Sequence, residues 1–290
     1  MSYILEANTP PPVVIHLDSR KGQQLQTGLT TNFLYTLKEP LLVPDHMSLL
    51  LSLHTATIPY SFYNVRSGVN NTITFYVAGV SKPLVLDDGN YSASTILNLM
   101  KTHLETETNI TLANISYSRE SLKFKFSYTG SASSLLINFA ESSASDLIGI
   151  TENTSMTAGQ IKTSQNAVDL NDAIHGLYVR QNLATKGTLD TDEGTFSNIL
   201  ARIPINTNAG GIIFMSPTAN QHETMISVPL VQTIGIRLTD DKHRTINLNG
   251  LHFQLSLKLS YIHREKLRTL PIRRPTRPNI KINDTKSKKN

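Results

Sequence analysis

The sequence predicts an all-β protein, a jelly-roll β-sandwich that carries a small β-α-β-β insertion and flexible terminal arms. Three observations predict it: many short strands are separated by turn residues, a single convincing helix stands among them, and a basic, proline-broken tail follows the last strand. We expect an N-terminal arm at residues 1–12, a jelly-roll domain at 13–263 with an insertion or subdomain at about 72–150, and a basic C-terminal tail at 264–290.

The clearest strand is Leu251–Ile262, with the sequence LHFQLSLKLSYI. Apolar residues occupy every second position from Leu251 to Tyr261, and polar residues such as Gln254 and Lys258 occupy the positions between them. A strand with this alternation buries one face and exposes the other to water. The segment therefore predicts the last strand of a half-buried sheet.

The other strands of the sandwich are shorter and are bounded by proline, glycine and asparagine. They are predicted at Val13–Asp18, Phe33–Leu37, His46–Ile58, Gly176–Val179, Ile199–Ile205, Gly211–Met215 and Thr233–Leu238, with turns at Asn208–Gly211 and Thr239–Arg244. Short strands with regular turns are typical of sandwiches and jelly rolls.

The insertion is predicted from a change of pattern between Thr72 and Ile150. Its strands are expected at Thr72–Val77, Ile115–Ser118, Leu122–Tyr128 and Leu135–Phe139. Its helix is expected to begin after an N-cap at Ser92 and to bury Ile96, Leu97, Met100 and Leu104. A short helical turn at Ser143–Leu147 should stop at Gly149, and the polar segment Thr151–Val168 should be a mobile or partner-bound loop.

Composition limits the protein class. The 290 residues contain no cysteine, which excludes disulfides, thiolate metal sites and cysteine nucleophiles. The N-terminus has no signal-peptide pattern, and no apolar run reaches the ~18 residues of a membrane span. We expect a protein made in the cell interior, without a signal peptide and without a membrane span.

Positive charge is concentrated at the C-terminus. Ten lysines and arginines and two acidic residues give residues 264–290 a net charge of +8, whereas the whole chain carries +5. The cations are Arg264, Lys266, Arg268, Arg273, Arg274, Arg277, Lys281, Lys286, Lys288 and Lys289. Such a segment predicts salt-sensitive contact with a polyanion, and the alternative is a solvated terminus that only aids solubility.

No arrangement of residues indicates catalysis. The nine histidines, including His54 and His252, lack the spacing of metal ligands, so we expect structural or solvated roles and no metal or cofactor. The carboxylate pairs Asp87-Asp88 and Asp240-Asp241 lie in predicted turns, where aspartate accepts hydrogen bonds from backbone N–H groups. Gly210-Gly211 is not followed by a helix, and Ser197, Ser216 and Ser227 lack a nucleophile context, so we expect no enzyme.

Several blocks resemble the penton, or vertex minor capsid, proteins of double-stranded DNA viruses, with virophages of the Mavirus type and Polinton-like viruses as the nearest comparison. The blocks are SLHTATIPYSFYNVRSGVNNTITF from Ser52 to Phe75, GNYSASTILNLMKTHL from Gly89 to Leu104, IRLTDDKHRTINLNGLHFQLSLKLSYI from Ile236 to Ile262, and HLDSRKG from His16 to Gly22. The similarity of pattern extends over most of the chain from Val13 to Ile262.

This resemblance implies a structural virion protein at the capsid vertices. Its subunit would be a jelly roll that forms a homopentamer, contacts the major capsid protein and directs its tail toward packaged double-stranded DNA or an internal capsid protein. The alternative is a receptor- or carbohydrate-binding β-sandwich of a virion surface, which binds its ligand through the loops Val65–Asn71 and Thr151–Gln165. A hydrolase built on a jelly roll is the third and weakest hypothesis.

Overall fold

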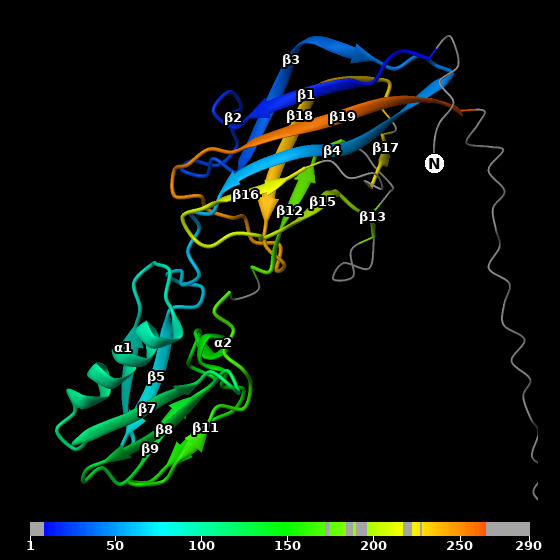
Figure 1. Ribbon diagram of the computed structural model, residues 1–290. Helices are drawn as coiled ribbons and strands as arrows, with labels where there is room; N and C mark the ends of the chain where they lie inside the picture. The colour runs from blue at the N-terminus through cyan, green and yellow to red at the C-terminus, as the bar shows by residue number, and fades with distance from the viewer. Residues whose placement is uncertain are drawn as a thin grey trace, which may run out of the picture.

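The computed structural model describes residues 9–171, 174–183, 188–189, 196–216, 222–226 and 228–264. Figure 1 shows two bodies. The two ends of the described chain build the upper body, a β-sandwich, and the middle of the chain builds the lower one. We call them the jelly roll and the inserted lobe.

Sheet A of the jelly roll is antiparallel and has the order β1-β19-β4-β16, with β17 also paired to β4. Its strands are β1 (Val13–Asp18), β4 (Met47–Pro59), β16 (Ile212–Met215), β17 (Thr224–Ile226) and β19 (Gln254–His263). Strand β4 is the longest of the described strands and pairs with β19, β16 and β17. The last strand therefore lies in the middle of the sheet, between the first strand and β4.

Sheet B is also antiparallel and has the order β15-β12-β18-β3-β2. Its strands are β2 (Gln23–Gln24), β3 (Asn32–Leu42), β12 (Gly176–Gln181), β15 (Ile199–Pro204) and β18 (Leu230–Thr239), and a separate short pair is formed by β13 (Thr188–Leu189) and β14 (Phe196–Ser197). The strands that follow one another in sequence mostly lie in opposite sheets.

This strand order is that of a jelly roll. In chain order the principal strands are β1, β3, β4, β12, β15, β16, β18 and β19. Sheet A joins the first, eighth, third and sixth of them, and sheet B joins the second, seventh, fourth and fifth. Two Greek keys wound into two facing sheets produce this alternation, so the predicted fold class is confirmed.

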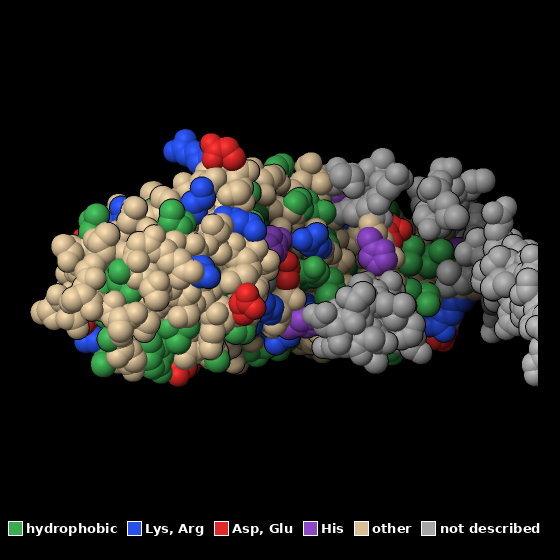
Figure 2. Space-filling view, turned by 90° about the horizontal axis from the view of Figure 1, so that it is seen from below, with side chains coloured by type: hydrophobic (Ala, Val, Ile, Leu, Met, Phe, Trp, Pro, Cys, Tyr) green, Lys and Arg blue, Asp and Glu red, His purple; other side chains and the backbone are tan. Residues whose placement is uncertain are grey.

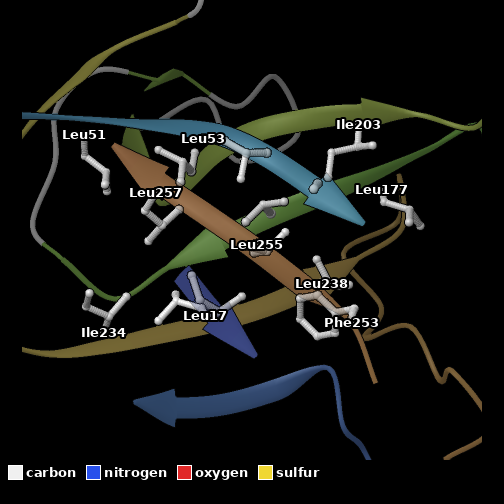
Figure 3. Packing of buried hydrophobic residues seen from close by; sticks show 14 of the residues in the cluster. Leu17, Leu51, Leu53, Leu177, Ile203, Ile234, Leu238, Phe253, Leu255 and Leu257 are labelled. Atoms are coloured by element: carbon white, nitrogen blue, oxygen red, sulfur yellow. The ribbon is translucent and has the colours of Figure 1, made fainter. Parts of the chain in front are cut away.

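The core of the jelly roll lies between the two sheets (Figure 3). Leu255 and Leu257 of β19 and Leu53 of β4 point toward Leu177 and Leu238 of sheet B, and all five side chains are buried. The alternation seen in the sequence is therefore the inner face of sheet A. One detail was wrong: β19 begins at Gln254, and Leu251 precedes it in a loop with its side chain exposed.

The inserted lobe lies between β4 and β12 in the chain. Its elements are β5 (Thr72–Val77), β6 (Val80–Val85), α1 (Ala93–Glu105), β7 (Leu112–Ser118), β8 (Lys123–Thr129), β9 (Leu135–Asn138), α2 (Ser145–Ile148), β10 (Thr154–Met156) and β11 (Lys162–Thr163). They form the sheets β10-β9-β5-β6 and β11-β8-β7. Two strands precede the helix, so the predicted β-α-β-β order omitted β6.

A second hydrophobic cluster fills the inserted lobe, with contributing side chains from Val65 to Leu170. The helix α1 contacts β7 and buries Ile96, Met100 and Leu104, as its spacing predicted, whereas Leu97 is only partly buried. The Ser92 side chain accepts a hydrogen bond from Thr95 N–H at 3.2 Å, as expected of the N-cap. The jelly roll and the inserted lobe thus have separate cores. The sequence-based domain boundaries stay a prediction.

Three local differences from the expected elements have physical reasons. The β5–β6 hairpin turns at Ala78-Gly79, where both residues have positive φ, and alanine is a weak signal for such a turn. Leu122 also has a positive φ of 56° and lies in the β7–β8 turn instead of in the strand. The segment expected to be a mobile loop pairs with the lobe through β10 and β11, and its Met156 side chain is buried.

We predict that the two cores respond separately to truncation. Leu257→Ala removes a fully buried side chain between the jelly-roll sheets and should lower the free energy of unfolding of that body by about 2–5 kcal/mol. Lys258→Ala, on the outer face of the same strand, should change it by less than about 0.5 kcal/mol. Native-state hydrogen exchange should show the loss in jelly-roll amides, and an equal loss in the inserted lobe would contradict separate cores.

Candidate functional site at the junction of the two bodies

The histidines that the sequence raised as possible ligands have structural surroundings. His252 Nδ1 lies 3.0 Å from Ser19 Oγ, and His54 lies in β4 where the register with β19 shifts. Within the described ranges, no group of three or more His, Asp or Glu side chains is placed to hold a metal ion. None of the described helices has the length and apolar character to cross a membrane.

The pair Asp240-Asp241 lies at a turn, as predicted, whereas Asp87 and Asp88 lie in the loop that follows β6. Asp88 accepts a hydrogen bond from Ser67 N–H, and Asp240 Oδ1 accepts from Lys242 N–H at 3.0 Å and Arg244 N–H at 2.8 Å. Among the candidate serines, Ser197 accepts from Ile199 N–H at 3.2 Å. Ser227 lies outside the described residues.

Asp240 is the centre of the contact between the two bodies. Its side chain is fully buried, and its Oδ2 atom accepts a hydrogen bond from Arg244 Nε at 2.6 Å. Oδ2 also forms an ion pair at 3.6 Å with Arg66 Nη1, which comes from the chain entering the inserted lobe. A buried carboxylate needs such partners because leaving water is costly for an unpaired charge. We call residues 240–244 the junction turn.

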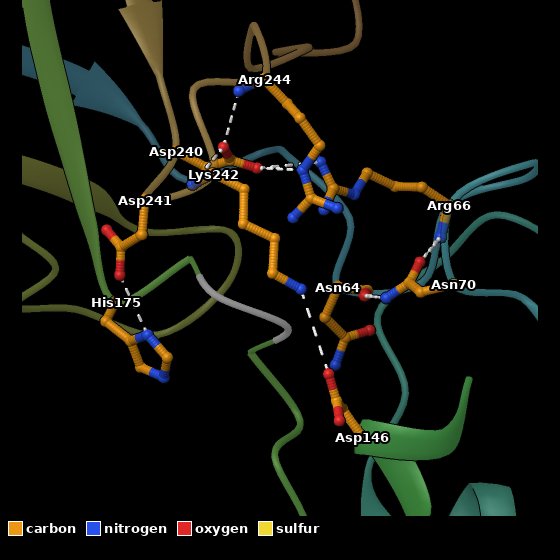
Figure 4. Close-up of polar contacts among 9 residues, drawn as sticks. All are labelled: Asn64, Arg66, Asn70, Asp146, His175, Asp240, Asp241, Lys242 and Arg244. Carbon is orange, nitrogen blue, oxygen red and sulfur yellow. Dashed lines mark hydrogen bonds and ion pairs between the residues drawn. The ribbon is translucent and has the colours of Figure 1, made fainter. Parts of the chain in front are cut away.

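The segment around Arg66 is held by asparagine side chains, which fix the position of the arginine (Figure 4). Asn70 accepts from Arg66 N–H at 2.8 Å and donates to the Asn64 carbonyl at 2.7 Å. Asn64 in turn exchanges two 2.8 Å hydrogen bonds with the backbone of Tyr91. The expected ligand-binding loop Val65–Asn71 is therefore tied into the junction by its own hydrogen bonds.

A second set of ionic contacts lies beside Asp240. His175 Nδ1 is 3.1 Å from Asp241 Oδ2 of the junction turn, and its Nε2 is 3.6 Å from Asp169 Oδ1 at the end of the inserted lobe. Lys242 of the same turn lies 4.0 Å from Asp146 of α2. The ring nitrogens of His175 point to opposite sides, so the imidazole bridges two carboxylates across the joint.

The HLDSRKG block forms the end of β1 and the turn after it. The Arg20 guanidinium donates to both oxygens of Asp18, at 2.7–3.1 Å. These hydrogen bonds hold the pKa of the Asp18 carboxyl well below its usual range. Gly22 packs against Phe33, because a Cβ atom there would lie 2.2 Å from the ring. The block thus encodes a turn and a close packing contact.

Of the ten tail cations, only Arg264 lies in the described part of the chain. Its backbone N–H donates to the His46 carbonyl at 2.9 Å, and its Nε donates to Ser48 Oγ at 3.3 Å. The other nine fall outside the described residues, namely Lys266, Arg268, Arg273, Arg274, Arg277, Lys281, Lys286, Lys288 and Lys289. Their contact with a polyanion or an internal capsid protein stays a prediction.

Sequence reasoning found the junction turn but missed its partners. The pair Asp240-Asp241 was assigned to a turn from its residue types alone. Arg66 and His175 carry no local signal, since an arginine or histidine in a polar loop is usually solvated. The available signal was that Arg66 and Asp240 belong to two blocks resembling the same class of protein.

Comparison with known proteins gives matches among solved structures and none among sequence families or curated proteins. The structure is similar to the crystal structure of the mavirus penton protein, with 12% sequence identity and a TM-score of 0.48, over 87% of this chain and 100% of that one. That is the class of protein which the sequence blocks resemble. The jelly-roll assignment rests on the strand order and not on this similarity.

We predict that Asp240→Asn weakens the joint. The change keeps the shape of the side chain but leaves Arg66 and Arg244 without the buried negative charge, so the free energy of unfolding should fall by about 3–5 kcal/mol. The matched control is Asp146→Asn, which removes the half-exposed 4.0 Å pair with Lys242 and should cost less than about 1 kcal/mol. Equal effects of the two changes in urea denaturation would contradict the role given to Asp240.

Proposed function

We propose that the chain is a structural capsid protein that forms the pentameric vertex, or penton, of an icosahedral virion of the virophage or Polinton-like type. Five copies associate around the five-fold axis, and their outer edges contact the major capsid protein. Each contact joins two different surfaces of neighbouring subunits, and a rotation near 72° per contact closes the ring after five copies. The function is assembly and not catalysis.

The sequence blocks that resemble penton proteins lie together in space, and this observation supports the proposal most directly. Arg66 belongs to the first block, and Asp240 and Arg244 belong to the third. These residues form the ion pairs of the junction. The resemblance therefore concerns the joint between a jelly roll and its inserted lobe, which is a more specific feature than any single strand.

The inserted lobe and the start of the tail lie at opposite ends of the jelly roll (Figure 1). The β19 strand begins beside Thr57 of β4, close to the inserted lobe, and ends at His263 beside Met47. Arg264 therefore leaves the end that is remote from the junction. This polarity fits a vertex subunit whose lobe faces outward and whose basic tail starts toward the packaged genome.

The inserted lobe itself offers little charge for binding nucleic acid. In Figure 2 its end is covered mainly by backbone and uncharged side chains, with a few Lys, Arg, Asp and Glu residues scattered among them. Binding of a polyanion depends on clustered positive charge, which in this chain occurs in the tail sequence. We therefore assign any contact with packaged DNA to the tail.

An exposed leucine pair is a candidate contact between subunits. Leu42 of β3 and Leu230 of β18 are cross-strand partners at the end of sheet B, and their side chains are 72% and 39% exposed. Interaction sites are marked by contiguous apolar surface, and this pair would be part of such a surface between two subunits. Their burial against a neighbouring jelly roll would contribute hydrophobic free energy to ring closure.

We predict a five-fold ring. Native mass spectrometry of the purified protein, or of the protein incorporated into particles, should give five times the 32.1 kDa mass of the chain. Leu42→Asp should reduce the pentamer fraction at least tenfold, because it places a charge in the apolar contact. The control Leu112→Asp changes an exposed leucine of the inserted lobe and should leave the pentamer intact. A stable monomer that never enters particles would count against the proposal.

We also predict the role of the tail. A chain truncated after Arg264 keeps the contacts of that residue with His46 and Ser48, so its unfolding midpoint should be unchanged. It loses nine cations, and its affinity for double-stranded DNA should fall and lose most of its salt dependence, with less genome retained in particles.

A tail of the same composition in shuffled order separates the two partners considered for it. Electrostatic contact with DNA tolerates the shuffle, whereas recognition by an internal capsid protein does not. Unchanged particle yield and DNA content after truncation would refute a role of the tail in packaging.

A further inference from the structure

The outer face of sheet A carries two adjoining hollows, whose lining includes neither residue of the leucine pair proposed as a subunit contact. One has a volume of about 270 Å³ and the other about 380 Å³, and Asp18, Thr57 and Gln254 line both. In Figure 1 this face of β1, β19 and β4 is turned toward the viewer. The hollows lie near the end of the sheet that adjoins the inserted lobe, because Gln254 begins β19.

In the smaller hollow, the hydroxyl groups of Thr55 and Ser256 orient the imidazole of His16. His16, Ser256 and Thr55 are neighbours on three adjacent strands. Thr55 Oγ1 donates to Ser256 Oγ at 2.7 Å, and Ser256 Oγ lies 2.8 Å from His16 Nδ1. Ser256 thus holds the His16 ring at its Nδ1 atom and leaves the Nε2 atom for a hydrogen bond with a ligand.

In the larger hollow, a backbone N–H group and the Ser19 hydroxyl orient the imidazole of His252. Phe253 N–H donates to Ser19 Oγ at 3.1 Å, and Ser19 Oγ lies 3.0 Å from His252 Nδ1. Ser19 thus holds the His252 ring at its Nδ1 atom, and the Nε2 atom is likewise left for a hydrogen bond with a ligand. His252 lines the larger hollow and His16 the smaller one, so the two imidazoles flank the shared part.

The charged groups between them compensate each other. Asp18 and Arg20 form a bidentate pair with hydrogen bonds of 2.7–3.1 Å, and Gln254 Nε2 donates to Asp18 Oδ2 at 3.2 Å. The lining of the two hollows contains no other Lys, Arg, Asp or Glu. The site thus has no net charge with which to attract a phosphate, a sulfate or a metal ion.

An apolar wall completes the larger hollow. Ile212 of the edge strand β16 and Leu251 of the loop before β19 line it, and their side chains are 62% and 50% exposed. Pro59 lies beside Ile212, because the two residues are partners in the register of β16 and β4. One side of the hollow therefore offers hydrogen bonds, and the other offers apolar surface.

We propose that these hollows bind a neutral glycan. A sugar ring presents hydroxyl groups at its rim and C–H groups on its faces, which matches the donors and acceptors of His16, Gln254 and His252 opposite the apolar wall. The absence of net charge among the lining residues favours neutral hexose or N-acetylhexosamine chains over sialylated or sulfated ones. A concave site with a few oriented polar groups and an apolar surface has the general character of a ligand pocket. This inference does not depend on the capsid role.

The test uses the full-length protein on an array of neutral, sialylated and sulfated oligosaccharides, with the dissociation constant of the best neutral compound measured by calorimetry. We expect neutral chains to bind. Gln254→Ala removes a central hydrogen-bonding group and Ile212→Ala removes part of the apolar wall, so each should weaken binding about tenfold, equivalent to about 1.4 kcal/mol. The control Lys258→Ala lies on the same strand and face but outside both hollows, and it should leave the affinity unchanged.

Three results would overturn the inference. The first is an array without neutral compounds that bind, or with binding of sialylated or sulfated chains only. The second is neutral binding that neither Gln254→Ala nor Ile212→Ala weakens, which would locate the ligand elsewhere on the chain. The third is that no glycan binds the protein while Gln254→Ala and Ile212→Ala change the mass of its oligomer. This face would then be a contact surface between copies of the chain. A pentamer that fails to form would leave the glycan measurement valid.

Discussion

The buried carboxylate of Asp240 is the constraint on which the arrangement of the two bodies depends. It caps its own turn through two backbone N–H groups and binds two guanidinium groups, one from the same turn and one from the chain entering the inserted lobe. A single short turn between the last two strands therefore sets both the local chain path and the position of the lobe. Since the Asp240 side chain is fully buried, water and salt screen its ion pairs less than they screen the half-exposed pairs around it.

The sandwich was predictable wherever periodicity was strong. Strands β4 and β19 alternate over many residues, and the Ser92 cap with the spacing of Ile96 and Met100 marked α1. No local sequence pattern predicts the order of the strands within the sheets. It was predicted as a fold class because short strands with frequent turns have few stable solutions, and the jelly roll is one of them.

The candidate site was only partly predictable. Turn chemistry identified the role of Asp240 toward its own backbone, because aspartate in a turn commonly accepts such bonds. The contacts with Arg66 and the bridge made by His175 join segments far apart in sequence, and they depend on how the two bodies meet. The same holds for the hydrogen bonds on sheet A, where His16, Ser256 and Thr55 come together only through strand pairing.

The hairpin of β5 and β6 has a consequence for contacts between copies of the chain. Val77 pairs with Val80 across the turn, and Leu86 N–H donates to the Asn71 carbonyl. Hydrogen-bonded and non-hydrogen-bonded pairs alternate along an antiparallel ladder, and Val77 with Val80 is a hydrogen-bonded pair. Pro83, opposite Thr74, therefore belongs to a non-hydrogen-bonded pair, and its backbone faces away from β5 toward the open edge of the sheet. Proline has no N–H to donate there, so a strand from another copy of the lobe would lack one backbone hydrogen bond along this edge. In the proposed pentamer, this open edge would therefore disfavour pairing of neighbouring lobes into a continuous sheet.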